Sequence, residues 1–407
     1  MKIAEPIRLP CGVTLKNRLA KSAMSENMAK PGYFAGQEFY NLYKRWAEGG
    51  IGLSISGNVM IDRKHLGEAN NVVIEEGLDN HQGLKEWASA YGNTGNQIWV
   101  QLNHPGRQIP KFLSTDNVSA SAVPFDKPMD TMFATPRTLT EGEILDIIQR
   151  FGYAAKVVKD CGFGGVQIHG AHGYLVAQFL SPKTNIREDR WGGSIENRML
   201  FVIEVYNSIR KNVGEKFPVG IKINTADFQK GGFSHEEAIQ VTKKLSTLGI
   251  DLIELSGGTY EKPTMTGVKV KESTQKREAY FLEYAKDIKQ AVNCPIMVTG
   301  GFRTGKFMEE SLDNGDLDMV GLARPVAINP EFPNQLLGGE NVESEVKPLT
   351  SGFKILDSIY PLEIIWYTDQ LHRMGKLKEP RKNGGIYSSI FNMTCSMGFQ
   401  ILNRVRS

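Results

Sequence analysis

Residues 165–174 read GVQIHGAHGY, and this stretch says most about how the chain folds. Its first half is a short apolar run of the kind that forms a buried β-strand. Its second half carries two imidazoles and a phenol, on His169, His172 and Tyr174. Imidazole N–H groups donate hydrogen bonds, and a tyrosine hydroxyl can deliver a proton. A buried strand that ends in such groups is typical of the carboxyl edge of an α/β barrel.

Short apolar runs of this kind alternate along the chain with segments that carry apolar residues at helical spacing. There are eight runs, at residues 19–25, 51–57, 97–104, 164–169, 218–224, 251–256, 294–300 and 317–323. The helical segments between them include 140–161, 194–213, 234–248 and 277–292. Eight parallel strands close a barrel, so we predict an α/β fold, an eight-stranded parallel (β/α)8 TIM barrel. An open doubly wound sheet would need Gly-x-Gly-x-x-Gly after the first strand, where the chain reads ENM.

Two segments interrupt this alternation of apolar runs and helical segments. Residues 105–139 contain five prolines, too many for a helix interior, and we expect a loop or small hairpin that caps the barrel mouth after the third strand. Beyond about residue 340 the pattern is helical and aromatic. We therefore predict a barrel over residues 1–340, and a C-terminal helical extension over 341–407 that packs on or beside it.

The composition excludes several other classes of protein. A net charge of +3 over 407 residues gives no reason to expect nucleic-acid binding. No apolar run is long enough for a membrane span, and the first residues lack the apolar core of a signal peptide. The four cysteines are far apart, which argues against an iron–sulfur cluster or a zinc site, and we predict no metal ligands. A reducing, cytoplasmic location is the default expectation, and a homo-oligomer is left open.

Side-chain alternation turns several polar residues toward the barrel axis. On three strands the apolar residues share the outward face, which leaves Gln167, His169, Lys222 and Glu254 facing inward. On a fourth strand Gln101 shares the inward face with Trp99 and Asn103. A barrel interior is normally filled by branched apolar side chains, so this polar set needs an explanation. One explanation is an internal salt-bridge network in which Lys222 pairs with Glu254.

Glycine-rich turns follow the last two predicted strands. Gly300 and Gly301 follow the seventh strand, and Ala323 and Arg324 end the eighth. The loops after strands seven and eight of such barrels commonly bind phosphate through backbone N–H groups. Arg324 could hold a phosphate with its forked donors.

Taken together, these motifs resemble the Old Yellow Enzyme family of FMN-dependent NADH:flavin oxidoreductases, or ene-reductases, over roughly residues 1–340. The resemblance implies noncovalent FMN, with NADPH or NADH as hydride donor. It assigns flavin contacts to Ala23, Met24, Ser25, Gly57, Gln101, His169, Lys222, Gly300, Gly301, Ala323 and Arg324. Ser25, Lys222 and Ala323 depart from the threonine or cysteine, the arginine and the glycine that are usual there.

The resemblance also implies a reaction and its catalytic residues. His169 and His172 would bind the oxygen of a small electrophilic alkene, an α,β-unsaturated carbonyl or nitro compound, and Tyr174 would protonate the substrate carbon. In this interpretation Gln101, His169 and Lys222 hydrogen-bond the pyrimidine side of the flavin, which is compatible with a Lys222–Glu254 pair below it.

Less specific interpretations of the histidines remain open. His169 and His172 could be a satisfied polar pair at a strand end. They could also bind a metal, although no carboxylate or thiolate lies near them in sequence. The alternative functions are therefore a flavin-free metal-dependent barrel enzyme that uses His169 and His172, and a noncatalytic flavin-binding protein.

Overall fold

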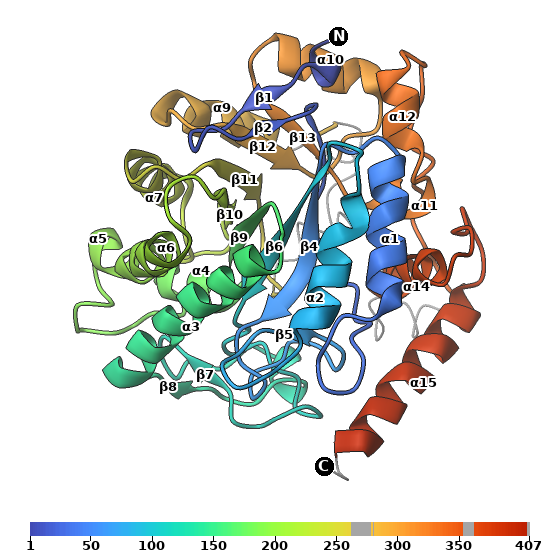
Figure 1. Cartoon of the computed structure of the whole chain (residues 1–407). Helices are drawn as coiled ribbons and strands as arrows, with labels where there is room; N and C mark the ends of the chain where they lie inside the picture. The colour runs from blue at the N-terminus through green and yellow to red at the C-terminus, as the bar shows by residue number, and fades with distance from the viewer. Residues whose placement is uncertain (262–277, 280, 353–361, 405–407) are drawn as a thin grey trace.

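Eight parallel strands close into a barrel in the computed structural model, which describes residues 1–261, 278–279, 281–352 and 362–404 (Figure 1). The strands are β3 (Leu19–Lys21), β4 (Leu53–Met60), β6 (Gln97–Asn103), β9 (Gly165–Gly170), β10 (Val219–Asn224), β11 (Leu252–Ser256), β12 (Ile296–Thr299) and β13 (Met319–Leu322). Each pairs in parallel with the next, and β3 pairs with both β13 and β4. Each of the eight predicted runs contains one of these strands or most of it, so the predicted barrel is confirmed.

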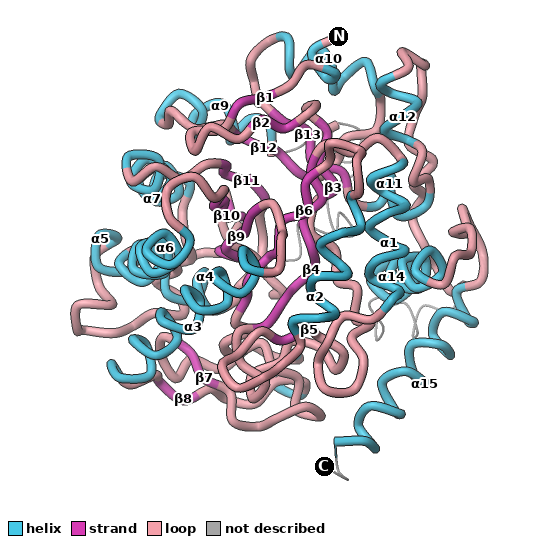
Figure 2. The backbone as a smooth tube through the Cα atoms, in the orientation of Figure 1, coloured by secondary structure: helices cyan, strands magenta, loops and turns pink. Residues whose placement is uncertain are grey.

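Helices surround the strands, as Figure 2 shows. They are α1 (Gln37–Glu48), α2 (His81–Ala88), α3 (Glu141–Asp160), α4 (Leu175–Leu180), α5 (Ile195–Arg198), α6 (Leu200–Val213), α7 (His235–Thr247), α9 (Leu282–Ala291), α10 (Gly305–Asp313), α11 (Arg324–Ile328) and α12 (Phe332–Leu337), with 3-10 turns at Lys2–Ala4, Ser89–Tyr91 and Met129–Thr131. Capping boxes begin α3 at Thr140 and α7 at Ser234. In each, the hydroxyl of the cap residue accepts a hydrogen bond from the N–H of the third helical residue, a glutamate. The carboxylate of that glutamate accepts a hydrogen bond from the N–H of the cap residue. The apolar stripes of these helices pack on the outward faces of the strands in one large core.

The half of the barrel interior that lies nearer the amino ends of the strands is apolar. Trp99, Leu252, Met297 and Met319 fill it, and the indole of Trp99 lies over Gly165, where a Cβ atom would come within 2.7 Å of the ring. The antiparallel strands β1 (Ile7–Arg8) and β2 (Thr14–Leu15) pack on this cluster and cover the amino end of the barrel. The amino end of the barrel is therefore closed by packed side chains.

The proline-rich insertion after β6 is mostly loop. Its two short strands, β7 (Val118–Ser119) and β8 (Arg137–Thr138), pair in parallel, so the expectation of a hairpin is wrong and that of a loop holds. Strand β7 contacts α4, and the ring of Phe133 lies 6.4 Å from that of Tyr260, centroid to centroid. The insertion therefore covers one side of the barrel mouth.

In the part of the C-terminal region that the structure describes, two helices follow the barrel. Helix α14 (Leu362–Gly375) packs on α1 and α11, and α15 (Ile386–Arg404) packs on α14 and projects from the body of the molecule (Figure 1). The side strand β5 (Val72–Val73) pairs with the end of β4. The division of the chain at residue 340 stays a prediction. Within the described part of the chain, no helix is both long and apolar enough to span a membrane.

Candidate active site

A sharp turn after β9 brings the two predicted histidines together. His172 and Gly173 both take positive φ angles, 59° and 76°, and the amide of His172 donates to Asn224 Oδ1 at 3.2 Å. This turn folds the chain back, so that His172 Nδ1 lies 3.2 Å from His169 Nε2. A positive φ is unfavourable for a residue with a side chain, and such strain often accompanies functional sites.

Asn58 joins this pair, although the sequence did not single it out. The pairing of β4 with β6 shifts by one residue between Ile55 and Asn58, a β-bulge. The shift turns Asn58 onto the inward face, opposite Gln101, where unbroken alternation would have turned it outward. Asn58 Oδ1 lies 2.8 Å from His169 Nδ1, and its Nδ2 donates to the hydroxyl of Tyr174 at 3.3 Å.

The donor and the acceptor of each hydrogen bond around the histidines can be assigned in turn, starting from Asn58. Because Asn58 donates to Tyr174, its oxygen faces His169 and accepts from Nδ1–H. In a neutral ring Nε2 of His169 then accepts from His172, and Nε2 of His172 accepts from the Ser256 hydroxyl at 2.8 Å. Burial, with the nearby Lys222 cation, lowers the pKa of His172 to about 3, and burial lowers that of His169 well below its ordinary value. Both imidazoles are neutral near pH 7.

Tyr174 is paired with a second tyrosine that the sequence pattern did not indicate. The hydroxyls of Tyr174 and Tyr260 lie 2.7 Å apart, and the ring of Tyr174 lies 4.6 Å from that of His169, centroid to centroid. Burial raises the pKa of Tyr174 well above its ordinary value and that of Tyr260 to about 12. Both phenols therefore keep their protons at neutral pH, as a general acid must.

Below the histidines the inward polar residues form a connected layer. Lys222 Nζ lies 2.9 Å from Glu254 Oε1, and Glu254 also accepts from Gln167 Nε2 and Thr299 Oγ1, each at 2.7 Å. Gln101 Nε2 donates to Gln167 Oε1 at 2.7 Å. The predicted Lys222–Glu254 pair is confirmed. The flavin contacts of Gln101 and Lys222 stay predictions.

The ends of β3 and β4 bring Ala23, Met24, Ser25 and Gly57 together. A Cβ atom at Gly57 would lie 2.3 Å from the carbonyl oxygen of Met24, so only glycine permits this close approach. Helix α14 supports the same loop, since His372 Nε2 lies 2.7 Å from the carbonyl oxygen of Glu26. Ser25 hydrogen-bonds Glu68, which is half-buried and whose pKa is raised by burial.

The predicted phosphate residues share one edge of the barrel because β12 and β13 are neighbours in parallel. Gly300 and Gly301 have φ angles of 112° and 84°, and the short helix α11 begins at Arg324, directly after Ala323. Arg324 Nη1 donates to Glu363 Oε2 of α14 at 2.9 Å. A glycine turn, a helix start and an arginine fit the phosphate of a mononucleotide.

Two buried amide atoms at the mouth point to a bound ring. Asn103 ends β6, and both its side-chain oxygen and nitrogen are buried without a partner among the described residues. A buried amide with no partner is costly, and a flavin offers both donors and acceptors along its edge. With Lys222 below and the glycine turns beside it, the set of residues fits FMN.

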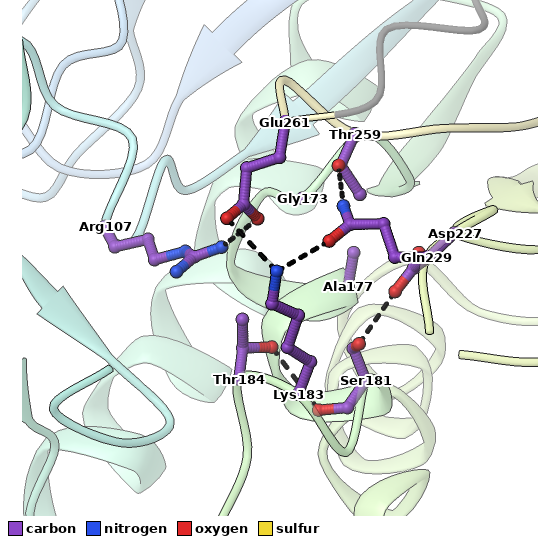
Figure 3. Close-up of a pocket in the computed structure, with 10 residues that line it drawn as sticks. All are labelled: Arg107, Gly173, Ala177, Ser181, Lys183, Thr184, Asp227, Gln229, Thr259 and Glu261. Atoms are coloured by element: carbon purple, nitrogen blue, oxygen red, sulfur yellow. Dashed lines mark hydrogen bonds and ion pairs between the residues drawn. The ribbon is translucent and has the colours of Figure 1, made fainter. Parts of the chain in front are cut away.

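A polar pocket is lined by Gly173, Thr259 and Glu261, which are the sequence neighbours of the two tyrosines, together with charged side chains such as Arg107 and Lys183 (Figure 3). Glu261, directly after Tyr260, accepts from Arg107 Nη2 at 2.7 Å and lies 3.4 Å from Lys183 Nζ. Arg107 comes from the insertion and also lies over the ring of Phe125, at 4.0 Å. These pairs tie the insertion to the residues that follow β11.

Comparisons with known proteins bear on this geometry. Residues 2–343 match the model of a family described as NADH:flavin oxidoreductase / NADH oxidase. The NADH-dependent flavin oxidoreductase iccE of Talaromyces variabilis is 36% identical over 358 residues, covering 83% of this chain and 86% of that protein. An NADPH dehydrogenase of Geobacillus is 31% identical, and the match covers 79% of this chain and 90% of that protein. The solved structure of the old yellow enzyme homologue from Zymomonas mobilis superposes with a TM-score of 0.71 at 22% identity. The superposition covers 86% of this chain and 98% of that protein.

Proposed function

The chain belongs to the NADH:flavin oxidoreductase / NADH oxidase family, and we propose that it reduces the activated C=C bond of α,β-unsaturated carbonyl or nitro compounds. When bound, FMN supplies the hydride, which it takes from NADH or NADPH. The observation that carries the proposal is the joining of His169, His172 and Tyr174 at the carboxyl end of β9, two neutral imidazoles beside a protonated phenol.

The histidines bind the substrate oxygen in this proposal. In the tautomers assigned above, His169 donates to Asn58 and His172 donates from Nδ1 to His169 Nε2, so the N–H that a substrate oxygen takes is that of His172, while His169 positions the ring of His172. The Ser256 hydroxyl keeps His172 in this tautomer, because it donates to His172 Nε2 and leaves the proton of the ring on Nδ1. Neutral donors aimed at the oxygen stabilise the negative charge that grows on it during reduction.

Tyr174 delivers the proton. Its hydroxyl accepts from Asn58, so its own hydrogen is available to Tyr260 or to a substrate carbon. The hydrogen bond to Tyr260, at 2.7 Å, provides a second phenol from which the proton can be replaced after each turnover.

A metal-dependent reaction at the same histidines has less support. Within the described ranges, the group of histidine, cysteine and acidic side chains close enough to hold a metal includes neither His169 nor His172. Both rings are instead engaged by neutral hydrogen-bond partners, Asn58 and Ser256.

Product analysis tests the proposal. The purified protein is incubated with NADH or NADPH and with 2-cyclohexenone or a nitroalkene, and the products are separated by chromatography. We expect the saturated product and a requirement for added FMN in flavin-stripped protein. Nicotinamide oxidation that consumes only oxygen and leaves every alkene unchanged would reject ene reduction.

A further inference from the structure

Asp62, His65 and His104 form a cluster that the proposed reaction does not use. Asp62 and His65 lie in the loop after β4, and His104 follows the last residue of β6. These two strands are neighbours, with Met60 paired to Asn103, so the two loops start side by side. Each of the three side chains offers one ligand atom, and these atoms lie within 4.8 Å of one another.

Hydrogen bonds leave one nitrogen of each ring without a partner. His104 Nδ1 accepts from the amide of Gly106 at 3.1 Å, so the proton of a neutral ring is on Nε2. That Nε2 is buried with no partner among the described residues, and His104 is 1% exposed. His65 Nδ1 lies 2.7 Å from Asp62 Oδ2, and its Nε2 is likewise buried and unpartnered in the described part of the chain.

Two unsatisfied ring nitrogens in one buried cluster are costly for a purely structural feature. A buried polar group without a hydrogen bond lowers the stability of the fold. The two rings are only 4.7 Å apart, centroid to centroid, so protonating both would place like charges side by side. A metal ion removes these costs because it replaces the proton on a ring nitrogen and attracts the carboxylate.

We propose that Asp62, His65 and His104 bind one divalent transition-metal ion, for which Zn²⁺ is the best match. Two imidazoles and one carboxylate are a ligand set that Zn²⁺ accepts, with water in the fourth position. The carboxylate is held in place beside the two rings, because Asp62 Oδ1 accepts from the Lys64 amide at 2.8 Å and Asp62 Oδ2 lies 2.7 Å from His65 Nδ1. The side chain of His65 is 11% exposed and provides the route of entry.

The ion would join two loops at the rim of the barrel. His104 lies between Asn103, at the mouth, and the start of the insertion with Arg107. A metal here acts as a structural clamp between the loop after β4 and the insertion, and we assign it no part in the reaction.

Metal binding is tested on the flavin-loaded protein after dialysis against a chelator. Zn²⁺ alone is titrated by calorimetry, and bound metal is counted by mass spectrometry after a second dialysis. We expect one ion per chain and a higher Tm, which the chelator reverses. His104→Asn should weaken Zn²⁺ binding by at least about 100-fold. Removing a residue that only hydrogen-bonds a metal ligand already weakens binding by about 10- to 100-fold, and removing a ligand itself should weaken it more.

His235→Asn is the matched control. His235 also pairs with an aspartate, Asp287, at 3.0 Å, but it does so without a second histidine. This control should bind one ion like the parent protein. If His104→Asn loses flavin or fails to fold, His65→Asn provides the same test at a partly exposed position. Parent protein that retains no zinc, or a His65→Asn variant that binds zinc as tightly as the parent, would overturn the proposal.

Discussion

Replacing Lys222 by methionine separates its two predicted roles. Lys222 and Glu254 are both buried, 3% and 0% exposed, and their charged atoms lie 2.9 Å apart. Methionine keeps most of the side-chain volume but leaves Glu254 as an uncompensated charge. Removing one partner of a buried ion pair costs about 3–5 kcal/mol of stability.

The double variant Lys222→Met/Glu254→Gln is the control for this loss. It removes both charges. The amide oxygen of the introduced glutamine can still accept from Gln167, and its NH2 group can donate to the hydroxyl of Thr299, which can turn its own hydrogen to Ser22. Replacing a whole buried pair by neutral groups is often neutral or stabilising, so we expect the double variant to recover most of the roughly 3–5 kcal/mol. The measurement is urea unfolding of flavin-stripped protein for parent, single and double variants.

The flavin role is then measured on the double variant alone. If Lys222 also donates to bound FMN, the stable double variant still loses a charge-assisted hydrogen bond of about 1.5–3 kcal/mol. That loss corresponds to roughly 10- to 150-fold weaker FMN binding, measured by flavin fluorescence. Unchanged FMN affinity would refute the flavin contact, and a single variant as stable as the parent would refute the structural account of the pair.

Three further variants test the site. Tyr174→Phe should slow enone reduction by about 10²- to 10⁴-fold, the usual contribution of a general acid, while reduction of the flavin by NADH keeps its rate; stopped-flow kinetics separates the two. Asn58→Leu removes the acceptor that orients His169, so phenol binding, followed by the long-wavelength absorbance it induces, should weaken; unchanged binding would contradict the assigned orientation. Glu363→Gln frees Arg324 for phosphate and should tighten FMN binding by about 2- to 5-fold, the value of a partly exposed ion pair, with no effect on riboflavin, which lacks the phosphate.

The barrel could be predicted from the sequence because its signals are local. Each strand is a short apolar run between helical patterns, and the capping boxes at Thr140 and Ser234 are formed by residues only three positions apart in the sequence. Strict alternation also placed Lys222 and Glu254 on the inward face, where the structure pairs them. The assignment of strands and helices and the assignment of inward faces both depend only on the periodicity with which side chains point along a helix or a strand.

The missed residues depend on irregular or long-range geometry. Asn58 faces inward only because a bulge in β4 breaks the alternation. Gly57 lies at that bulge and is a sequence signal for one, but strict alternation was applied across it. Tyr260 lies beyond the end of β11, where strand parity no longer applies. Glu363 reaches Arg324 from a helix 39 residues later in the chain, a contact that sequence spacing does not reveal.

The central claim is that electrons taken from a nicotinamide are passed to an activated alkene. It is tested most directly by reducing the purified protein with one equivalent of NADH without oxygen, and then adding 2-cyclohexenone while the flavin absorbance is followed. We expect the absorbance to be lost on adding NADH and to return with the enone, with one saturated product formed per flavin. A flavin that stays reduced in the presence of the enone and recovers only when oxygen is admitted would contradict the account.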